Sequence, residues 1–213
     1  MSASKVASEP VVRRRQPEKV RESVVQAALS VFATGGYDGT SMQQIADEAG
    51  VSLPLIVYHF KSKEKLWQAA VGCAVEQFDQ LMAAAMSDES KSSPTEQLRA
   101  IIKAFVRVSV KFPQVRRMMA MESYTMTPRL QWMGEHYARR HHDTIIELIV
   151  RAQKAGDVVK IEPHRLSFLI VDMATITSGA AEYQYLTGRD PFSSREVKAT
   201  IGSINTIVFT SEQ

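Results

Sequence analysis

The sequence predicts an all-α protein of about nine helices, with a small N-terminal helix-turn-helix domain and a larger helical C-terminal domain. Three observations lead to this prediction. Apolar residues recur at helical spacing along most of the chain, serine or proline opens most apolar segments, and glycine ends several of them. No convincing strand is present, because the apolar pair at residues 158 and 159 is too short and lacks a partner.

Composition narrows the class of protein further. The chain has 213 residues, of which 45% are hydrophobic and 23% are charged, so it can bury a sizeable core. Its apolar runs are far shorter than the ~20 residues that a membrane helix needs, and no apolar signal core follows the basic N-terminus. We therefore expect a soluble, cytoplasmic protein with no membrane partner. The single cysteine, Cys73, excludes an internal disulfide.

Positive charge is concentrated at the N-terminus. Residues 1–21 hold six lysines and arginines against two glutamates, although the net charge of the whole chain is only +3. We expect a disordered basic arm over residues 1–16. Such an arm is either a solvated tail or a segment attracted to a polyanion.

The first expected helices span residues 17–35, 41–50 and 52–60. Pro17 suits a first helical turn, and a glycine ends each of the first two helices. Ser41 and Gln44 have the spacing of a capping box, which predicts the start of the second helix. We therefore expect the helix-turn-helix domain over residues 17–62.

The remaining helices are expected in the larger domain, residues 63–213. Each begins at a capping serine or threonine, or at a proline in the first turn. Their expected starting residues are Ser62, Ser93, Pro113, Thr127, Pro163 and Ser193. Two of these helices are expected to run without a break, over residues 127–156 and 163–188.

The two short helices over residues 41–50 and 52–60 match a helix-turn-helix. Only a brief turn around Gly50 separates them, and the small side chains of Ala46 and Ala49 allow the helices to approach closely. In such a unit the second helix presents its N-terminal residues to base edges in the major groove, while the first crosses the phosphate backbone. This stretch therefore predicts binding to double-stranded DNA.

The segments GGYDGTSMQQIADEAGVS and YHFKSKEKL, within residues 18–66, resemble the DNA-binding domain of the TetR family of bacterial transcriptional repressors. The turn glycine, the alanine spacing, the aromatic pair and the following lysine all fall in register with the motif of the family. The resemblance implies three DNA-binding helices and a C-terminal domain for dimerisation and ligand binding. It thus implies a transcriptional regulator, most commonly a repressor, that binds a palindromic operator as a homodimer and is released by a small-molecule effector.

The resemblance also implies which side chains meet DNA. The residues expected at phosphates are Ser41, Gln43, Tyr58, His59 and Lys63, and those expected in the groove are Ser52, Leu53, Pro54 and Val57. Family members commonly carry a lysine and a tyrosine where this chain has Leu53 and Val57. These two residues indicate that part of the site is read by apolar contacts, for example with thymine methyl groups. For Val57, packing within the domain is an equal alternative.

A ligand cavity is expected in the C-terminal domain, where aromatic residues and flexible methionines are concentrated. Its predicted residues are Trp67, Phe78, Phe105, Arg116, Met119, Glu122, Trp132, His136 and Tyr137. The alternative for each is a role in the core or on the surface. The segments FPQVRRMMAMES and GDVVKIEPHRLSFLI are similar to parts of a pyrimidine-utilisation regulator of the same family, which implies a small polar heterocycle as ligand. A fatty or aromatic compound, or a xenobiotic, stays open.

Dimerisation is expected through the last two helices. A run of small residues over 174–181 permits close helix approach, and Ile201, Ile204, Ile207 and Val208 form an apolar stripe. In the TetR family the last two helices pair with those of a second copy, which sets two recognition helices about 34 to 36 Å apart, one turn of duplex. The alternative is a monomer that buries these helices in its own core.

The sequence shows no signature of an enzyme. It contains no phosphate-binding glycine loop and no nucleophile elbow, and His136, His141 and His142 lack the cysteine or paired acid that would complete a metal site. We therefore expect no enzymatic activity, no metal and no cofactor. Two other classes stay open: a small-molecule enzyme or carrier that uses the C-terminal cavity, and a protein-interaction module.

Overall fold

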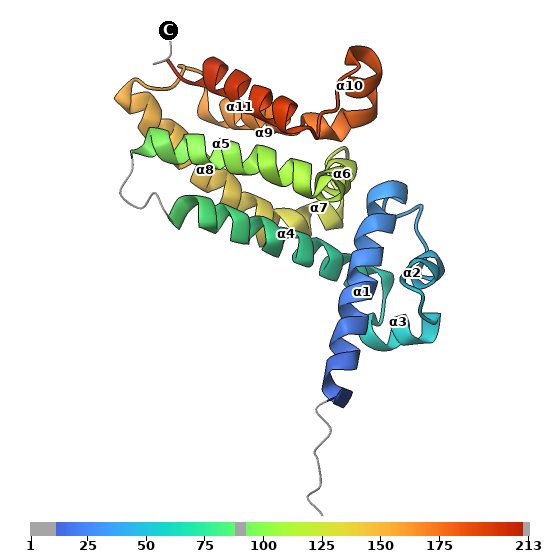
Figure 1. The fold of residues 1–213 in the computed structure, drawn as a ribbon. Coiled ribbons are helices and arrows are strands. Elements are labelled where there is room, and N and C mark those ends of the chain that lie inside the picture. Colours follow the sequence, from blue (N-terminus) through green and yellow to red (C-terminus); the bar gives the residue numbers. More distant parts are fainter. Residues whose placement is uncertain (1–11, 88–92, 211–213) are drawn as a thin grey trace, which may run out of the picture. The chain divides into compact units, whose positions relative to one another are not determined.

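The protein is helical throughout the computed structural model, which describes residues 12–87 and 93–210. In these two ranges the chain forms the helices α1 to α11 with a π-helical and a 3-10 turn, which confirms the predicted fold class (Figure 1). The described residues contain no strand, and an isolated bridge pairs Val158 with Phe209. Within the same ranges, no helix has both the length and the apolar character needed to cross a membrane.

The chain divides into two compact units, Met1–Val71 and Gly72–Gln213. The division falls inside α4 (Lys63–Ser87), whereas the sequence suggested a boundary just before this helix. Trp67, near the start of α4, is buried and meets the ring of Tyr37 edge-on, with 6.1 Å between the ring centroids. The first turns of α4 therefore belong to the core of the first unit.

The first unit consists of α1 (Val12–Gly35), α2 (Met42–Ala49), α3 (Leu53–Phe60) and the start of α4. The predicted start of the first helix was wrong, because α1 begins at Val12 and Pro17 lies inside it. Arginine and glutamine, which precede the proline, are good helix formers and extend the helix in the N-terminal direction. The rest of the expected basic arm, residues 1–11, lies outside the described residues.

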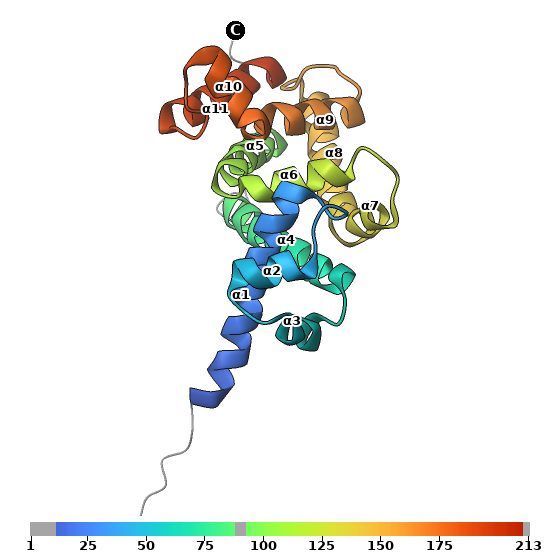
Figure 2. The ribbon, with the colours of Figure 1, turned by 90° about the vertical axis from the view of Figure 1, so that its right-hand side faces the viewer.

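A small core fixes the two short helices. Helix α2 packs on α1, and α3 packs on α2 (Figures 1 and 2). The fully buried side chains in this core include Val24, Ala28, Phe32, Ile45 and Ile56. Each large apolar side chain that is buried contributes about 1.5–3 kcal/mol, so a few such residues hold the angle between the helices.

Both ends of α2 form as the sequence predicts. Ser41 Oγ accepts a hydrogen bond from the Gln44 amide at 3.1 Å, and Gln44 Oε1 accepts one from the Ser41 amide at 2.7 Å, so the capping box is confirmed. At the other end Gly50 has a φ of 65°, a left-handed conformation that favours glycine because it has no Cβ. The Val51 amide then donates to the Ala46 carbonyl at 3.0 Å and closes the turn.

The second unit contains the rest of α4 and the helices α5 to α11. Their bounds are α5 (Pro94–Lys111), α6 (Pro113–Glu122), α7 (Pro128–Met133), the π-helical turn (Gly134–Ala138), α8 (Arg139–Ala155), α9 (Pro163–Ala174), the 3-10 turn (Ile176–Gly179), α10 (Ala180–Thr187) and α11 (Ser194–Val208). One helix that was expected to be continuous, over residues 163–188, is interrupted, so the described ranges hold more helices than expected. The helix expected over 127–156 keeps a helical backbone through α7, the π-helical turn and α8, and the π-helical turn begins at the poor helix former Gly134.

A tertiary interaction explains the break between α9 and α10. The Ser109 carbonyl on α5 has no intrahelical donor, because the residue four positions later is Pro113, which lacks an N–H. Thr177 donates to this carbonyl from Oγ1 at 3.1 Å, and Ser109 Oγ donates to the Ala174 carbonyl at 2.8 Å. The helix expected over residues 163–188 is therefore interrupted where these buried groups bond to α5.

This break changes the expected dimerisation surface. The small residues over 174–181 do not lie on one helix, and Ala174, Thr175 and Thr177 are buried within the unit. In α11 the same holds for Ile204 and Val208, whereas Ile207 is exposed. The prediction that the small residues form one close-approach helix was therefore wrong, because they are needed inside the subunit.

The core of the second unit lies among α5, α8, α9 and α11, which pack on one another (Figure 1). Its most deeply buried members include Leu98, Ile102, Ile149, Leu166 and Ile204. The end of the described chain closes this core, because Phe209 is buried and the Arg99 guanidinium lies 3.8 Å from the centroid of its ring.

We expect a pH-dependent contribution from the N-terminus of α9. The Glu162 carboxylate accepts hydrogen bonds from the amides of Arg165 at 2.8 Å and His164 at 3.1 Å, and these bonds lower the pKa of Glu162. A carboxyl whose pKa is lowered by folding stabilises the fold above its unfolded pKa, and this stabilisation is lost as the pH falls through the folded value. Glu162→Gln should therefore lower the melting temperature at neutral pH, and the difference from wild type should shrink as the pH falls below about 4.3 and vanish only below the lowered pKa of the folded state.

Circular dichroism melts over a pH series measure this difference. The control is Glu147→Gln, because Glu147 is exposed on α8 and pairs only weakly with Arg151, at 3.8 Å. Equal melting curves for wild type and Glu162→Gln at neutral pH would contradict the assigned cap.

Candidate functional site

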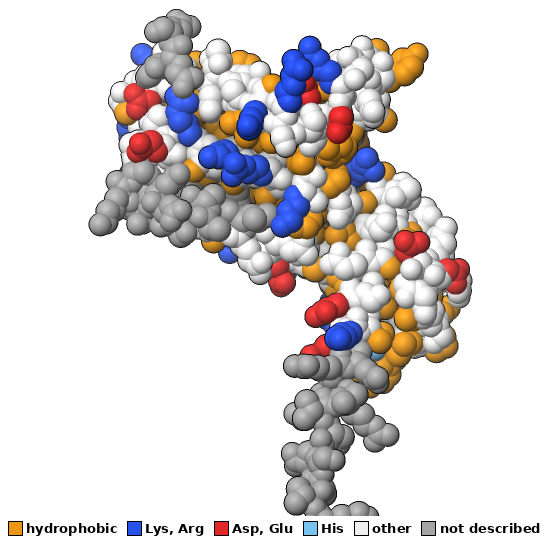
Figure 3. Space-filling model, in the orientation of Figure 1, with side chains coloured by type: hydrophobic (Ala, Val, Ile, Leu, Met, Phe, Trp, Pro, Cys, Tyr) orange, Lys and Arg blue, Asp and Glu red, His pale blue; other side chains and the backbone are white. Residues whose placement is uncertain are grey.

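Helix α3 presents apolar side chains to solvent. Ile56 and Phe60 are buried in the small core, whereas Val57 is 43% and Tyr58 is 70% exposed. Pro54, in the first turn, is exposed as well. Hydrophobic side chains accordingly gather at the surface over α3 (Figure 3). Core packing therefore does not account for Val57, and an exposed apolar helix face is typical of a binding surface.

The other residues expected at DNA have accessible side chains. Ser41, Gln43 and Ser52 are exposed, and Leu53, His59 and Lys63 are half-buried. Gln43 Nε2 donates to Asp47 Oδ1 at 2.7 Å, which orients its amide along α2. The His59 ring meets the Tyr58 ring edge-on, with 5.2 Å between the centroids.

An aromatic cluster orients Lys63. The ring of Tyr37 stacks on Phe32 at a centroid distance of 6.0 Å, and Lys63 Nζ lies 4.4 Å from the centroid of the Tyr37 ring. A cation over an aromatic face is attracted by the quadrupole of the ring. The same cluster contains Trp67, which was expected at the ligand site and instead belongs to the core of the first unit.

Lys61 connects α3 and α4 through a strained turn. It has φ 65° and ψ −41°, and among the described residues it is the one non-glycine residue with a positive φ. The Ser62 amide donates to the Phe60 carbonyl at 2.7 Å, so Lys61 is the centre of a γ-turn of the rare type with positive φ. Lys61 Nζ lies 5.2 Å from the centroid of the exposed Tyr58 ring. The strained turn thus places a cation beside the apolar face of α3.

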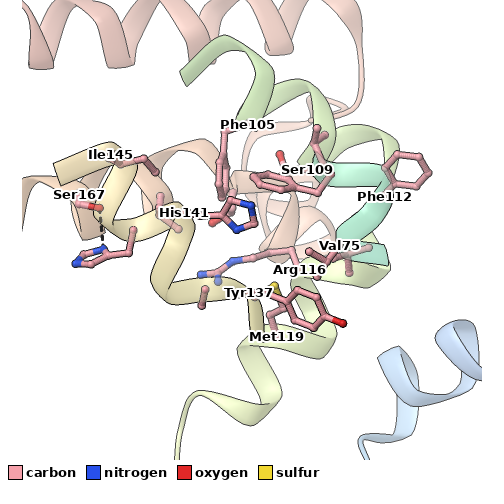
Figure 4. Close-up of a pocket in the computed structure, with 17 residues that line it drawn as sticks. Val75, Phe105, Ser109, Phe112, Arg116, Met119, Tyr137, His141, Ile145 and Ser167 are labelled. Carbon is pink, nitrogen blue, oxygen red and sulfur yellow. Dashed lines mark hydrogen bonds between the residues drawn. The ribbon is translucent and has the colours of Figure 1, made fainter. Parts of the chain in front are cut away.

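The second unit contains a cavity of about 180 Å³, lined by residues of α4, α5, α6, the π-helical turn, α8 and α9 and partly open to solvent (Figure 4). Phe78, Phe105, Phe112 and Tyr137 contribute aromatic rings, and aliphatic side chains supply much of the remaining wall. The Phe78 ring lies edge-on to Phe105 at 5.2 Å and to His141 at 5.0 Å. Burial raises the pKa of Tyr137, and the charges of Glu76 and Asp79 raise it further.

Basic side chains belong to the cavity wall, whereas no carboxylate lines it. His141 Nε2 lies 2.5 Å from Asp79 Oδ1, and Asp79 also pairs with Arg140 at 2.6 Å. His142 bonds through its ring nitrogens to Ser167 at 3.4 Å and to His164 at 2.9 Å.

Arg116 is the remaining basic residue of the wall. Its Nη2 lies 3.3 Å from Asp172 Oδ1, and its Nε is buried without a hydrogen-bond acceptor. Figure 4 shows the Arg116 side chain extending between the rings of His141 and Tyr137. In residues 12–87 and 93–210, no cluster of three or more histidine, cysteine or acidic side chains could hold a metal ion.

The cavity gathers only part of the expected ligand residues. Those that line it are Phe78, Phe105, Arg116, Met119 and Tyr137. Glu122, Trp132 and His136 do not. Glu122 is buried in an ion pair with Arg129 at 3.0 Å, and the Trp132 ring stacks on His136 with 4.6 Å between the centroids. These contacts satisfy their polar and aromatic groups outside the cavity.

Some lining residues were missed from the sequence. They are mainly Ser109, Phe112, His141, His142 and Thr175. Helical spacing from Phe105 would have indicated Ser109, four positions later on the same face of α5, and Phe112, seven positions later and directly after the helix. No sequence signal indicated Thr175, because it lies at the tertiary break after α9.

A helix-turn-helix unit with an exposed second helix, joined to a helical unit with an apolar cavity, is the architecture of a DNA-binding regulator that responds to a small molecule. The profile described as "Bacterial regulatory proteins, tetR family" matches residues 24–70, and that of the "YcdC-like protein, C-terminal region" matches residues 75–212. The chain therefore belongs to the TetR family of transcriptional regulators, as the sequence resemblance implied.

Individual relatives agree with this assignment. The transcriptional regulator RutR of Escherichia coli K12 is 29% identical over 158 residues, which are 74% of this chain and 73% of RutR. The transcriptional activator FasR of Mycolicibacterium smegmatis is 26% identical over 181 residues, 85% of this chain and 79% of FasR. The structure of AibR in complex with isovaleryl coenzyme A and operator DNA has a TM-score of 0.71 at 17% identity, covers 88% of this chain and 97% of AibR, and shows the same fold.

Replacing Lys61 tests the strain in the turn between α3 and α4. Lys61→Gly should raise the free energy of unfolding by about 1 kcal/mol, because glycine adopts a positive φ without a steric penalty. Urea denaturation measures this change. Lys65→Gly, in the first turns of α4, is the control and should lower the free energy of unfolding by about 1 kcal/mol. Destabilisation by both variants would show that Lys61 is not strained.

Proposed function

We propose that this chain is a repressor that binds a two-fold symmetric DNA operator as a homodimer and leaves it when a small molecule occupies the cavity of the second unit. The observation that carries the proposal is the exposed apolar face of α3 within a capped helix-turn-helix. In this position Leu53, Pro54 and Val57 suit contact with base edges and thymine methyl groups. Tyr58, His59 and Lys63 offer hydroxyl, imidazole and ammonium donors for phosphate oxygens.

The remaining expected contacts fit the same arrangement. Ser41 caps the N-terminus of α2, and Gln43 lies in its first turn. The N-terminus of a helix carries a partial positive charge and free amide donors, so a phosphate is favoured there. Ser52 precedes α3, and its side chain makes no capping hydrogen bond to the helix. Its hydroxyl is therefore available for DNA.

A ligand releases DNA only if it binds one state of the protein better than the other. The cavity wall includes Val75 and Phe78 of α4, the helix whose first turns belong to the DNA-binding unit. An occupant that moves these side chains acts on an element that both units share. AibR, with the same fold, is described with an acyl-coenzyme A and operator DNA together, which supports a ligand site and a DNA site in one chain.

The dimer is proposed to form over α9, α10 and α11. Apolar side chains are exposed there although the unit has its own complete core, and they are Phe168, Leu169, Tyr185, Leu186, Phe192 and Ile207. Large apolar side chains clustered at a surface mark an interaction site. A second copy of the chain is the partner that the resemblance to the family implies, and a two-fold interface would present two α3 helices to one operator.

Selection of random duplex DNA by the purified protein tests the DNA-binding part. We expect enriched sequences with two-fold symmetry. A reporter gene behind the enriched sequence then tests the sign of regulation, with reduced expression expected in the presence of the protein. Absence of enrichment at low and moderate salt would overturn the proposal. Increased expression of the reporter would show that the protein is an activator, as FasR is named, and not a repressor.

The roles of Lys63 and Leu53 are separable on the enriched duplex. Lys63→Ala should weaken binding to selected and random duplex by the same factor and reduce the slope of log affinity against log salt by about 1, since it removes a phosphate contact. Leu53→Ala should leave the salt slope unchanged and reduce the preference for the selected sequence by roughly tenfold. Fluorescence anisotropy over a salt series measures both. Lys65→Ala is the control cation, and indistinguishable Lys63 and Leu53 variants would contradict the division of roles.

Light scattering tests the dimer at micromolar concentration. Wild type should have twice the mass of one chain, and Ile207→Glu should dissociate it, because the interface would bury an unpaired carboxylate. Thr206→Glu adds the same charge to an exposed position next to it on α11 and should have a smaller effect. A monomeric wild type would remove the basis for the proposed interface.

A further inference from the structure

We propose that the occupant of the cavity is a small aromatic carboxylate, with its ring among Phe78, Phe105 and Tyr137 and its carboxylate on Arg116. This inference rests on the proposed function for the regulatory meaning of binding, although the binding itself is independent of DNA. Four properties of the cavity lead to it: its volume, its rings, its charge and its one unsatisfied donor.

The volume limits the occupant to about one ring. An apolar cavity of roughly 150 Å³ is known to accept a single benzene molecule. The cavity here measures about 180 Å³, which adds room for a short substituent and no more. A long acyl chain or a whole coenzyme A thioester exceeds this volume and would have to extend out of the cavity into solvent.

The aromatic side chains that line the cavity favour an aromatic ligand over a compact aliphatic ligand. Phe78 makes edge-on contacts with both Phe105 and His141, and Tyr137 lies across the same space. Aromatic pairs gain about 0.5–1.5 kcal/mol beyond the burial of their area when they meet edge-on or offset. A single ring placed here can continue the edge-on packing of the wall.

Most polar groups of the wall are already satisfied within the protein. Ser109 Oγ shares its single hydrogen between the carbonyls of Val106 at 2.9 Å and Ala174 at 2.8 Å, and Thr175 Oγ1 donates to the Asp172 carbonyl at 3.2 Å. His141 and His142 have the partners described above. Arg116 Nε is different: of the buried side-chain polar atoms in the described residues, it is the one in this wall that lacks a partner.

The Arg116 guanidinium therefore has hydrogen-bonding capacity left for an anion. Its pairing with Asp172 is weak, because the distance is 3.3 Å and the Asp172 side chain is 69% exposed. After a small movement of the side chain that exposes Nε, a ligand carboxylate can accept from Nε and a terminal nitrogen together, the two-point geometry that arginine offers to carboxylates. Because no acidic side chain lines the cavity, an anion meets no repulsion from the wall itself.

A neutral polar heterocycle fits this wall poorly, although similarity to a pyrimidine-utilisation regulator implied one. A pyrimidine-type ring presents alternating N–H and carbonyl groups, and each must be matched when it is buried. The wall has no asparagine, glutamine, aspartate or glutamate side chain to accept and donate in that pattern. Each unmatched group would lose about 1–3 kcal/mol of binding free energy, whereas a carboxylate needs only Arg116.

The test is a thermal-shift titration of the full-length protein without DNA, followed by calorimetry for the probes that bind. The probes are benzoate and phenylacetate, their neutral amides, uracil and decanoate. We expect the two aromatic carboxylates to raise the melting temperature and the amides, uracil and decanoate to have little effect. Stabilisation by the amides to the same extent, or by uracil or decanoate instead of the aromatic acids, would overturn the proposal, as would no stabilisation by any probe.

Matched variants locate the carboxylate. Arg116→Gln should weaken benzoate binding roughly 10- to 100-fold, the loss expected for a charge-assisted pair. Arg117→Gln removes an exposed neighbouring charge and should bind like wild type. Asp172→Asn keeps the guanidinium and removes its weak partner, so benzoate should bind at least as tightly as in wild type. Unchanged affinity in Arg116→Gln, with benzoate bound by wild type, would overturn the assignment.

DNA release is measured separately on the selected duplex. Benzoate that binds the protein and leaves DNA affinity unchanged would retain the ligand assignment and contradict the proposed release. Sequence-specific DNA binding by a protein that ignores every probe would retain the regulator and overturn the ligand class. The two proposals therefore fail in distinguishable ways.

Discussion

The architecture of the second unit depends on one backbone carbonyl that its own helix cannot satisfy. Ser109 lies four residues before Pro113, so its carbonyl receives no amide hydrogen from the chain that follows. A buried carbonyl left unpaired costs about 1–3 kcal/mol. Thr177 supplies the missing donor, and the Ser109 hydroxyl returns a hydrogen bond to Ala174. This exchange ties the end of α5 to the break between α9 and α10, and it sets the position of the cavity wall around Ser109 and Thr175.

The charge in the cavity follows from the same junction. Pro113 begins α6, and Arg116 lies in the first turn of that helix, so its guanidinium reaches the cavity. Asp172, in the last turn of α9 before the break, is the partner that remains within reach. A wall built in this way is apolar with a single poorly paired arginine, which is the basis for the proposed preference for a ring with one negative charge. Relatives that share the fold at low identity need not share this wall, so their ligands do not transfer to this chain.

The first unit differs from the second, because the proposed DNA contacts need apolar groups outside the core. A few buried side chains, a capping box and one left-handed glycine fix α2 and α3 without help from α3's outer face. Val57 and Tyr58 are thereby left in solvent. The strained turn at Lys61 and the ring of Tyr37 beneath Lys63 hold two cations in place around that face. The cost of an exposed apolar surface is offset only if a partner covers it.

The sequence by itself determined the helical fold class, the capped helix-turn-helix and the family, because these depend on local spacing, caps and turn glycines. The capping box of Ser41 and Gln44 and the left-handed Gly50 involve residues only a few positions apart, so the pattern contains all the interacting groups. Only the tertiary structure decided where α9 ends, which small residues are buried, and which side chains line the cavity. Those outcomes depend on pairs such as Ser109 with Thr177 and Glu122 with Arg129, whose competition for partners no helical periodicity records. The same reason explains why Trp67, Glu122, Trp132 and His136 were expected at the cavity and lie elsewhere, whereas Arg116 lies in its wall with a donor still unpaired.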